Sequence, residues 1–198
     1  MDVRFSYDFE KALAAIVYIA SSGIEDLTKY KICKLLFLAD KYHLVRYGRP
    51  ITGDRICAME YGPVPSQTLN ILNDAITESH QDPRADLLTE KLHIDRVYHN
   101  PHLSSQLAGF DLEEHLSSSD LSALQYTVHQ HGRKSFEELK AVTHEMFAYR
   151  KAWAERVNSA PTMRYEDLFV DDGDALEGAL EEMLENSALR STFGAISV

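Results

Sequence analysis

Residues 28–66 read TKYKICKLLFLADKYHLVRYGRPITGDRICAMEYGPVPS, and their pattern organises the rest of the chain. In the first half of this stretch, apolar residues recur at helical spacing, which predicts a helix with a broad buried face. Thr28 is a suitable N-cap, and Gly48 is a suitable left-handed residue after the last turn, so the helix should span residues 28–47. Because this helix is so apolar, we expect it inside the domain with everything else packed around it.

The second half of the stretch breaks this helix and starts another. A Gly-Arg-Pro turn at residues 48–50 leads into residues 51–60, which we interpret as a short strand or extended arm. Pro63 and Pro65 exclude helical geometry just before them, so the next helix should begin near Ser66. We expect Gly62 to form a backbone turn that lets the arm cross the central helix closely.

The remaining segments predict further helices. Apolar residues at helical spacing indicate helices near residues 9–22, 66–78, 117–131, 135–144, 148–157 and 165–169. Between Asp82 and Ala108 this pattern weakens, and alternation from Leu92 to Tyr98 favours a β-hairpin or a small sheet. The expected fold is therefore mainly α (α+β), a compact bundle of about six to eight helices around the central helix with one small β element.

Composition indicates a globular chain in a reducing compartment. The chain has 198 residues, and no apolar run reaches the roughly 18 residues needed to span a bilayer. The first residues carry acids where a signal peptide needs an apolar core, so we expect a cytoplasmic protein without membrane contact. Only Cys33 and Cys57 occur, each in an apolar segment, which favours buried free thiols over a disulfide or a metal pair.

The formal charge of −11 is concentrated near the C-terminus. Nine acids and no base lie between Arg164 and Arg190, and the rest of the chain holds 22 acids against 20 bases. This balance argues against direct nucleic-acid binding and favours a basic protein partner. We divide the chain into a domain over residues 1–170 and an acidic amphipathic helix and tail over residues 171–198.

That acidic segment also has a helical apolar stripe, formed by Leu176, Leu180, Met183 and Leu184. Its apolar side should dock on the domain or on a second copy, while its acidic side steers a partner. The candidate partner-binding residues are the four glutamates of the acidic face, Glu177, Glu181, Glu182 and Glu185.

No complete catalytic motif is present. The sequence has no nucleophile elbow, phosphate loop, dinucleotide fingerprint or H-E-x-x-H pair, and it predicts neither a metal nor a cofactor. Asp40 and His43, one helical turn apart, could join His144 as metal ligands, although His43 on an apolar face is more typical of a hydrogen-bonded core histidine. The basic residues of the central helix are expected on its solvated side: Lys29, Lys31, Lys34, Lys41 and Arg46.

Four segments together resemble a known family. KLLFLADKYHLVRYGRPI at residues 34–51, AMEYGPVPS at 58–66, LKAVTHEMFAYRKAW at 139–153 and MRYEDLF at 163–169 are similar to the Panacea domain of SocA-like antitoxins and phage-associated GepA-like proteins. The resemblance runs from about residue 9 to residue 169. Ala148 and Tyr149 stand where the family has a Pro-Trp pair. The signature residues are assigned a structural role: Lys34, Leu35, Leu36, Phe37, Tyr61, Gly62, Pro63, Val64, Thr143 and His144.

The resemblance implies a non-catalytic protein that binds and neutralises a cognate toxin in a bacterial, prophage or phage setting. Neutralisation would proceed by covering a surface of the toxin, or by delivering the toxin to a protease. The alternative function is a metal-assisted hydrolase that uses Asp40, His43 and His144. A homodimer is compatible with either function.

Overall fold

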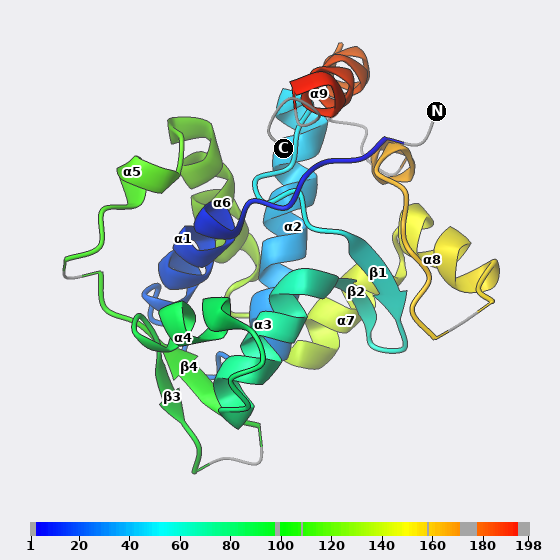
Figure 1. Ribbon diagram of the computed structural model, residues 1–198. Helices are drawn as coiled ribbons and strands as arrows, with labels where there is room; N and C mark the ends of the chain where they lie inside the picture. The colour runs from blue at the N-terminus through cyan, green and yellow to red at the C-terminus, as the bar shows by residue number, and fades with distance from the viewer. Residues whose placement is uncertain (1–2, 98–99, 108, 158, 171–177, 194–198) are drawn as a thin grey trace.

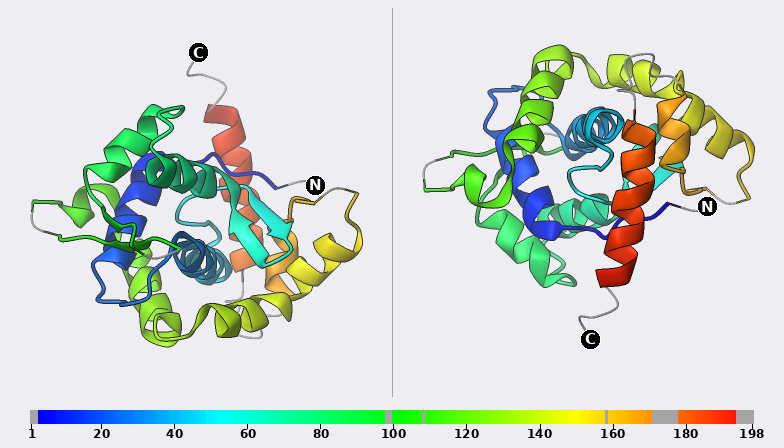
Figure 2. Two further views of the ribbon diagram at one scale, coloured as in Figure 1. Left: turned by 90° about the horizontal axis from the view of Figure 1, so that it is seen from below. Right: turned by 90° about the horizontal axis from the view of Figure 1, so that it is seen from above.

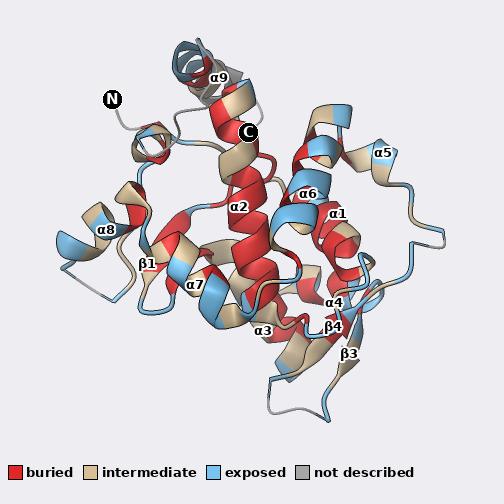
Figure 3. Cartoon of the chain, turned by 180° about the vertical axis from the view of Figure 1, so that it is seen from behind, coloured by how far each residue is buried: buried red, intermediate tan, exposed pale blue. Residues whose placement is uncertain are grey.

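The computed structural model describes residues 3–97, 100–107, 109–157, 159–170 and 178–193, and it places one helix at the centre (Figure 1). This helix, α2 (Lys29–Tyr47), begins where the Thr28 side chain accepts a hydrogen bond from the Lys31 backbone N–H, and it ends at Gly48 with φ +63°. Both ends match the prediction. Most of α2 is buried along its length, as Figure 3 shows.

Helices from distant parts of the chain surround α2, as a view along its axis shows (Figure 2). The surrounding helices are α1 (Phe9–Ala20), α3 (Ser66–Thr77), α6 (Ser118–His131) and α7 (Phe136–His144). Ser117 with Asp120, and Ser135 with Glu138, form complete capping boxes that begin α6 and α7. A short helix, α5 (Leu112–His115), precedes α6, and two more follow α7: α8 (Phe147–Ala154) and the 3₁₀ helix η1 (Glu166–Phe169). The mainly helical fold is thereby confirmed.

Two small antiparallel sheets complete the fold. β1 (Ile56–Met59) pairs with β2 (Gly62–Pro65) so that Met59 lies opposite Gly62, and Glu60 and Tyr61 form a two-residue turn. β3 (His93–Asp95) pairs with β4 (His102–Ser104). The predicted hairpin within residues 82–108 is therefore present, but the segment opens with a helix that we did not predict, α4 (Pro83–Thr89). Asp82 caps α4 and Pro83 occupies its first turn.

The last helix, α9 (Ala179–Phe193), packs across the C-terminal end of α2. Met183 is fully buried there, and a Cβ on Gly48 would come within 2.7 Å of the Met183 backbone nitrogen. Docking on the chain's own domain therefore agrees with one predicted option, but the apolar stripe was wrong in detail: Leu180 and Leu184 are 45% and 40% exposed. Leu176 lies outside the described residues. None of the described helices is long and apolar enough to cross a membrane.

Two of the five basic residues expected on the solvated side of α2 are buried instead, whereas Lys29, Lys41 and Arg46 are partly exposed. Lys31 and Lys34 are only 1% and 2% exposed. Lys31 Nζ lies 2.5 Å from the Asp26 carboxylate, and Lys34 Nζ donates a hydrogen bond to the Pro63 carbonyl at 2.9 Å. Helical spacing alone could not predict this burial, because both acceptors come from outside the helix. Cys33 and Cys57 are buried free thiols, as predicted.

Candidate functional site

The β1–β2 turn meets α2 and α7 at Gly62. A Cβ built on Gly62 would lie 2.5 Å from Lys34 Nζ, 3.0 Å from Thr143 Oγ1 and 3.1 Å from the His144 ring, and the glycine has φ +100°. No other residue type fits this backbone conformation and this space without a shift. The signature residues that are far apart in sequence are therefore neighbours around this one glycine.

Lys34 is the most unusual group in this cluster. Burial lowers the pKa of its ammonium to about 7, and the Pro63 carbonyl accepts its hydrogen bond. Thr143 beside it is buried and donates its hydroxyl to the Leu139 carbonyl at 2.9 Å. Lys34 therefore ties the central helix to the strand that follows the turn.

His144 closes the other side of the cluster. Its ring stacks on Tyr149 with centroids 4.4 Å apart, and the Tyr149 hydroxyl donates to the Met59 carbonyl at 2.9 Å. Its buried Nε2 makes no hydrogen bond with the described residues. Burial, together with the positive charges of Lys34 and Lys140, lowers the pKa of His144. The neutral imidazole therefore packs between Tyr149 and Gly62 and supports the β1–β2 hairpin.

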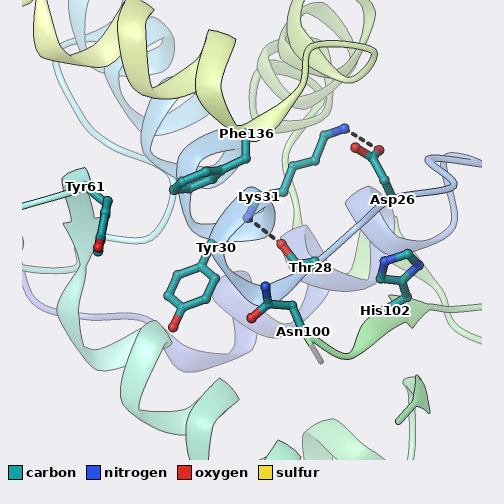
Figure 4. Close-up of a pocket in the computed structure, with 8 residues that line it drawn as sticks. All are labelled: Asp26, Thr28, Tyr30, Lys31, Tyr61, Asn100, His102 and Phe136. Atoms are coloured by element: carbon teal, nitrogen blue, oxygen red, sulfur yellow. Dashed lines mark hydrogen bonds and ion pairs between the residues drawn. The ribbon is translucent and has the colours of Figure 1, made fainter. Parts of the chain in front are cut away.

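Tyr61, at the tip of the turn, is 53% exposed although the cluster behind it is buried. Its ring lies 6.3 Å from Phe136 at the start of α7, and Phe136 lies 6.1 Å from Tyr30 near the start of α2. The three rings line one end of a groove of about 470 Å³ (Figure 4). We call this the aromatic groove. Its volume falls within the range typical of ligand and anchor sites.

The other end of the aromatic groove is polar. Asp26, Lys31, Asn100 and His102 line it, and a β-bridge between Thr28 and His102 connects this end to the β3–β4 sheet. The sequence did not predict this groove, because Tyr30, Tyr61 and Phe136 are distant in the chain and meet only in the fold. The one feature of the sequence that could have indicated the groove was Tyr61, an aromatic residue directly before the Gly62-Pro63 turn.

The three residues proposed for metal-assisted hydrolysis do not share a site. The Asp40 carboxylate accepts hydrogen bonds from the Ile51 and Thr52 backbone N–H groups and from the Thr52 hydroxyl at 2.6–2.9 Å. His144 belongs to the cluster around Gly62. Within the described ranges, no group of three or more His, Cys, Asp or Glu side chains is arranged to hold a metal ion.

His43 is engaged on both ring nitrogens. Nδ1 lies 2.7 Å from the Arg49 carbonyl and must donate to it, so Nε2 can accept from the Ser119 hydroxyl at 3.0 Å. Burial lowers the pKa of His43 to about 4, which keeps the imidazole neutral near pH 7. This arrangement corresponds to the hydrogen-bonded core histidine that its apolar position indicated.

The candidate acidic residues lie at the opposite end of α2. Glu181, Glu182 and Glu185 are exposed on α9, whereas Glu177 falls outside the described residues. Because α2 is 19 residues long, its two ends are about 27 Å apart. The aromatic groove and the acidic helix are therefore separate surfaces at the two ends of α2.

Comparison with known proteins identifies one family. A family model described as antitoxin SocA-like, Panacea domain, matches residues 32–150, which include α2 from its fourth residue onward, both small sheets, α7 and the cluster around Gly62. No curated protein and no solved structure matches the chain.

Proposed function

Because the chain belongs to the SocA-like Panacea-domain antitoxin family, we propose that it binds a cognate toxin protein and neutralises it without catalysing a reaction. Two of the three groups that could have served catalysis support this proposal, since Asp40 and His43 are engaged in internal hydrogen bonds. Because the polar atoms of these two side chains bind other parts of the chain, they stabilise the fold and are not available to bind a substrate.

The observation that carries the proposal is the presentation of Tyr61. Lys34, Thr143 and His144 crowd around Gly62 and fix the turn, yet the residue before that glycine points its ring into an open groove. Folding alone gives no reason to fix an exposed aromatic side chain so firmly. Rigid, half-exposed aromatic residues are the usual anchors of protein–protein interfaces, so we assign the toxin contact to the aromatic groove.

The acidic end has a complementary role in this proposal. Its carboxylates lie near the C-terminal end of α2, where the helix dipole is already negative, so they do not stabilise that helix. They instead produce a field that attracts a basic surface of the toxin before the groove engages. The toxin is then inactivated because this chain covers the surface that the toxin needs.

The test is a growth-rescue assay. Each reading frame adjacent to the gene of this chain is expressed from an inducible promoter, alone and together with the chain. We expect one frame to arrest growth and the chain to restore it. Tyr61→Ser should abolish rescue while the protein stays folded. The matched control is Tyr126→Ser, since Tyr126 is a similarly exposed tyrosine that stacks on Tyr42 on another part of the surface.

The same assay separates the two ways of neutralising the toxin. If the chain acts by covering the toxin, the toxin level stays constant and a stable complex can be isolated. If it delivers the toxin to a protease, the toxin level falls and recovers in a protease-deficient host. Rescue by Tyr61→Ser equal to rescue by the parent chain would reject the aromatic groove as the contact surface.

A further inference from the structure

The exposed side of α9 carries a short row of apolar residues. Leu180 and Leu184, one helical turn apart, are 45% and 40% exposed, and Ala188, one turn further along, is also exposed. Among the described helices, α9 is the one on which two large exposed apolar residues lie a turn apart. Seen from above, α9 lies across the top of the fold (Figure 2). We call these three residues the α9 stripe.

The contacts of α9 with the domain leave the α9 stripe open. Met183 is fully buried, and Asn186 donates its amide to the Gly48 carbonyl at 3.4 Å. Ser187 donates its hydroxyl to the Arg4 carbonyl at 3.0 Å. With 3.6 residues per turn, the stripe lies roughly 60–140° around the helix axis from Met183. The contacts that dock α9 therefore use a neighbouring face, and the stripe is not needed to hold the helix in place.

Acidic residues border the α9 stripe. Glu181 and Glu185 directly follow the two leucines, and both are exposed, as is Glu182. No ion pair joins any of the three to another described residue. The described side chains of α9 therefore carry three carboxylates and no basic group.

Basic residues on the segments that contact α9 are engaged elsewhere. At the adjoining end of α2, Arg46 lies over the Tyr42 ring at 4.5 Å. Arg49, just beyond this end, lies 3.0 Å from the buried Asp120 carboxylate. Arg4, whose backbone bonds to Ser187, also has a partner. The carboxylates beside the α9 stripe are therefore not neutralised by a described base.

The combination of an apolar stripe and bordering carboxylates selects among possible occupants. A second copy of the chain would bring the same carboxylates close to these, and like charges facing each other oppose association. A helix with apolar residues on one side and lysine or arginine beside them has the complementary arrangement. It would bury the leucines and pair with the carboxylates in one contact, which is a common mode of helix recognition.

We propose that the α9 stripe is a second contact surface for the toxin and receives an amphipathic helix whose apolar side is bordered by lysine or arginine. The identity of the partner as a toxin rests on the proposed function. The stripe adds a contact to the attraction already assigned to the acids, because leucines buried only in the complex slow dissociation. The aromatic groove lies at the other end of α2, so the toxin is held at two separate points.

The first test measures the kinetics of binding to the toxin identified by growth rescue. Leu180→Ser with Leu184→Ser removes the stripe. Its matched control is Leu87→Ser with Leu107→Ser, since these leucines are 45% and 41% exposed outside α9. We expect the stripe variant to dissociate about 5- to 30-fold faster, the effect of losing two partly buried leucines, with nearly the same association rate. The control variant should change neither rate.

The second test does not need the toxin. A synthetic helical peptide with leucine at helical spacing and lysine at the bordering positions is titrated into the full chain, and amide shifts are followed in ¹H–¹⁵N NMR spectra. The lysine peptide should shift amides of α9 and lose at least about 5-fold in affinity for the stripe variant but not for the control variant. The same peptide with glutamate in place of lysine should not bind. If the double variant disturbs α9, Leu184→Ala alone should give a smaller loss in the same direction.

Two results would overturn the inference. One is a stripe variant that keeps both the dissociation rate and the peptide affinity of the parent chain. The other is a parent chain that sediments as a dimer and a stripe variant that sediments as a monomer, because a second copy then covers the stripe. A chain that rescues growth through Tyr61 without any effect of the stripe retains the proposed function and loses this contact. A chain that binds the lysine peptide through the stripe but rescues no toxin retains the surface and loses the antitoxin function.

Discussion

Gly62 approaches Lys34 so closely that a Cβ on the glycine would come within 2.5 Å of the lysine nitrogen. This contact joins strand β2 to the second turn of the central helix, and both residues lie within the region that matches the family model. It also connects the buried cluster to the exposed Tyr61, because the position of the glycine fixes the direction of the preceding side chain.

Replacing Gly62 by Ala should therefore destabilise the fold. The positive φ costs about 1–2 kcal/mol for any residue with a Cβ, and crowding against Lys34 and Thr143 adds about 1–3 kcal/mol. Gly23→Ala is the matched control, since Gly23 has φ +71° but nothing within 4 Å of an added Cβ. Urea unfolding should show a clearly larger loss for Gly62→Ala. Equal losses would mean that the close approach has no energetic consequence.

Leu36 should make one of the largest single contributions to the core. It is fully buried on α2, so Leu36→Ala should lower the free energy of unfolding by about 2–5 kcal/mol through lost transfer energy and the cavity left behind. Leu180→Ala on the outer face of α9 should change it by less than about 0.5 kcal/mol. Similar denaturation midpoints for the two variants would contradict the central position of α2.

The buried Lys34 should make stability depend on pH. Its pKa is lowered by burial from 10.5 to about 7, so between these values the unfolded chain holds a proton that the folded chain has released. The free energy of unfolding should rise with pH in this window, by at most about 1.4 kcal/mol per pH unit from this group.

The measurement compares the parent chain with Lys34→Met by urea unfolding at pH 7 and at pH 8.5. The parent should gain stability relative to Lys34→Met as pH rises, and taking the difference removes groups common to both. Lys134→Met, a substitution outside the buried cluster, should follow the parent. A difference between parent and Lys34→Met that stays constant with pH would show that Lys34 keeps its proton in the fold.

Asp40 should behave as a structural carboxylate. Asp40→Ala leaves the two backbone N–H groups and the Thr52 hydroxyl without their buried acceptor, which should cost about 1–3 kcal/mol or more. A metal ion that binds the folded chain would raise its melting temperature. Because Asp40 and His144 do not share a site, we expect no such increase for the parent chain with Zn²⁺ or Mn²⁺. A metal-dependent increase that disappears in Asp40→Ala and His144→Ala would revive the hydrolase alternative.

The sequence predicted the features that depend on local chemistry. Thr28 and Gly48 bound α2, and the capping box at Ser135 begins α7, because these signals act within a few residues. The sequence did not predict the burial of Lys31 and Lys34, because their partners, Asp26 and Pro63, lie outside α2 and helical spacing carries no information about them. The aromatic groove could not be predicted either, since three separate elements have to fold before its rings meet.

The acidic helix illustrates the same limit and leads to the last prediction. Leucines at helical spacing were expected to face the domain, but α9 docks through Met183 against Gly48, and this contact turns Leu180 and Leu184 outward. Hydrogen bonds from Asn186 to the Gly48 carbonyl and from Ser187 to the Arg4 carbonyl hold the helix in this orientation. Glu181, Glu182 and Glu185 are then displayed to solvent.

Replacing Glu181, Glu182 and Glu185 together by Gln should slow association with the toxin identified by growth rescue and leave dissociation nearly unchanged. Steering by exposed charges acts on the encounter rate and fades as the Debye length falls from about 10 Å at 0.1 M salt to about 3 Å at 1 M. Stopped-flow or surface-binding kinetics at both salt concentrations measure this. The matched control replaces Glu90, Glu113 and Glu114, which are equally exposed on other elements and change the net charge by the same amount. If the two triple variants associate at the same rate, only the net charge matters, and the position of the carboxylates on α9 has no role in capturing the partner.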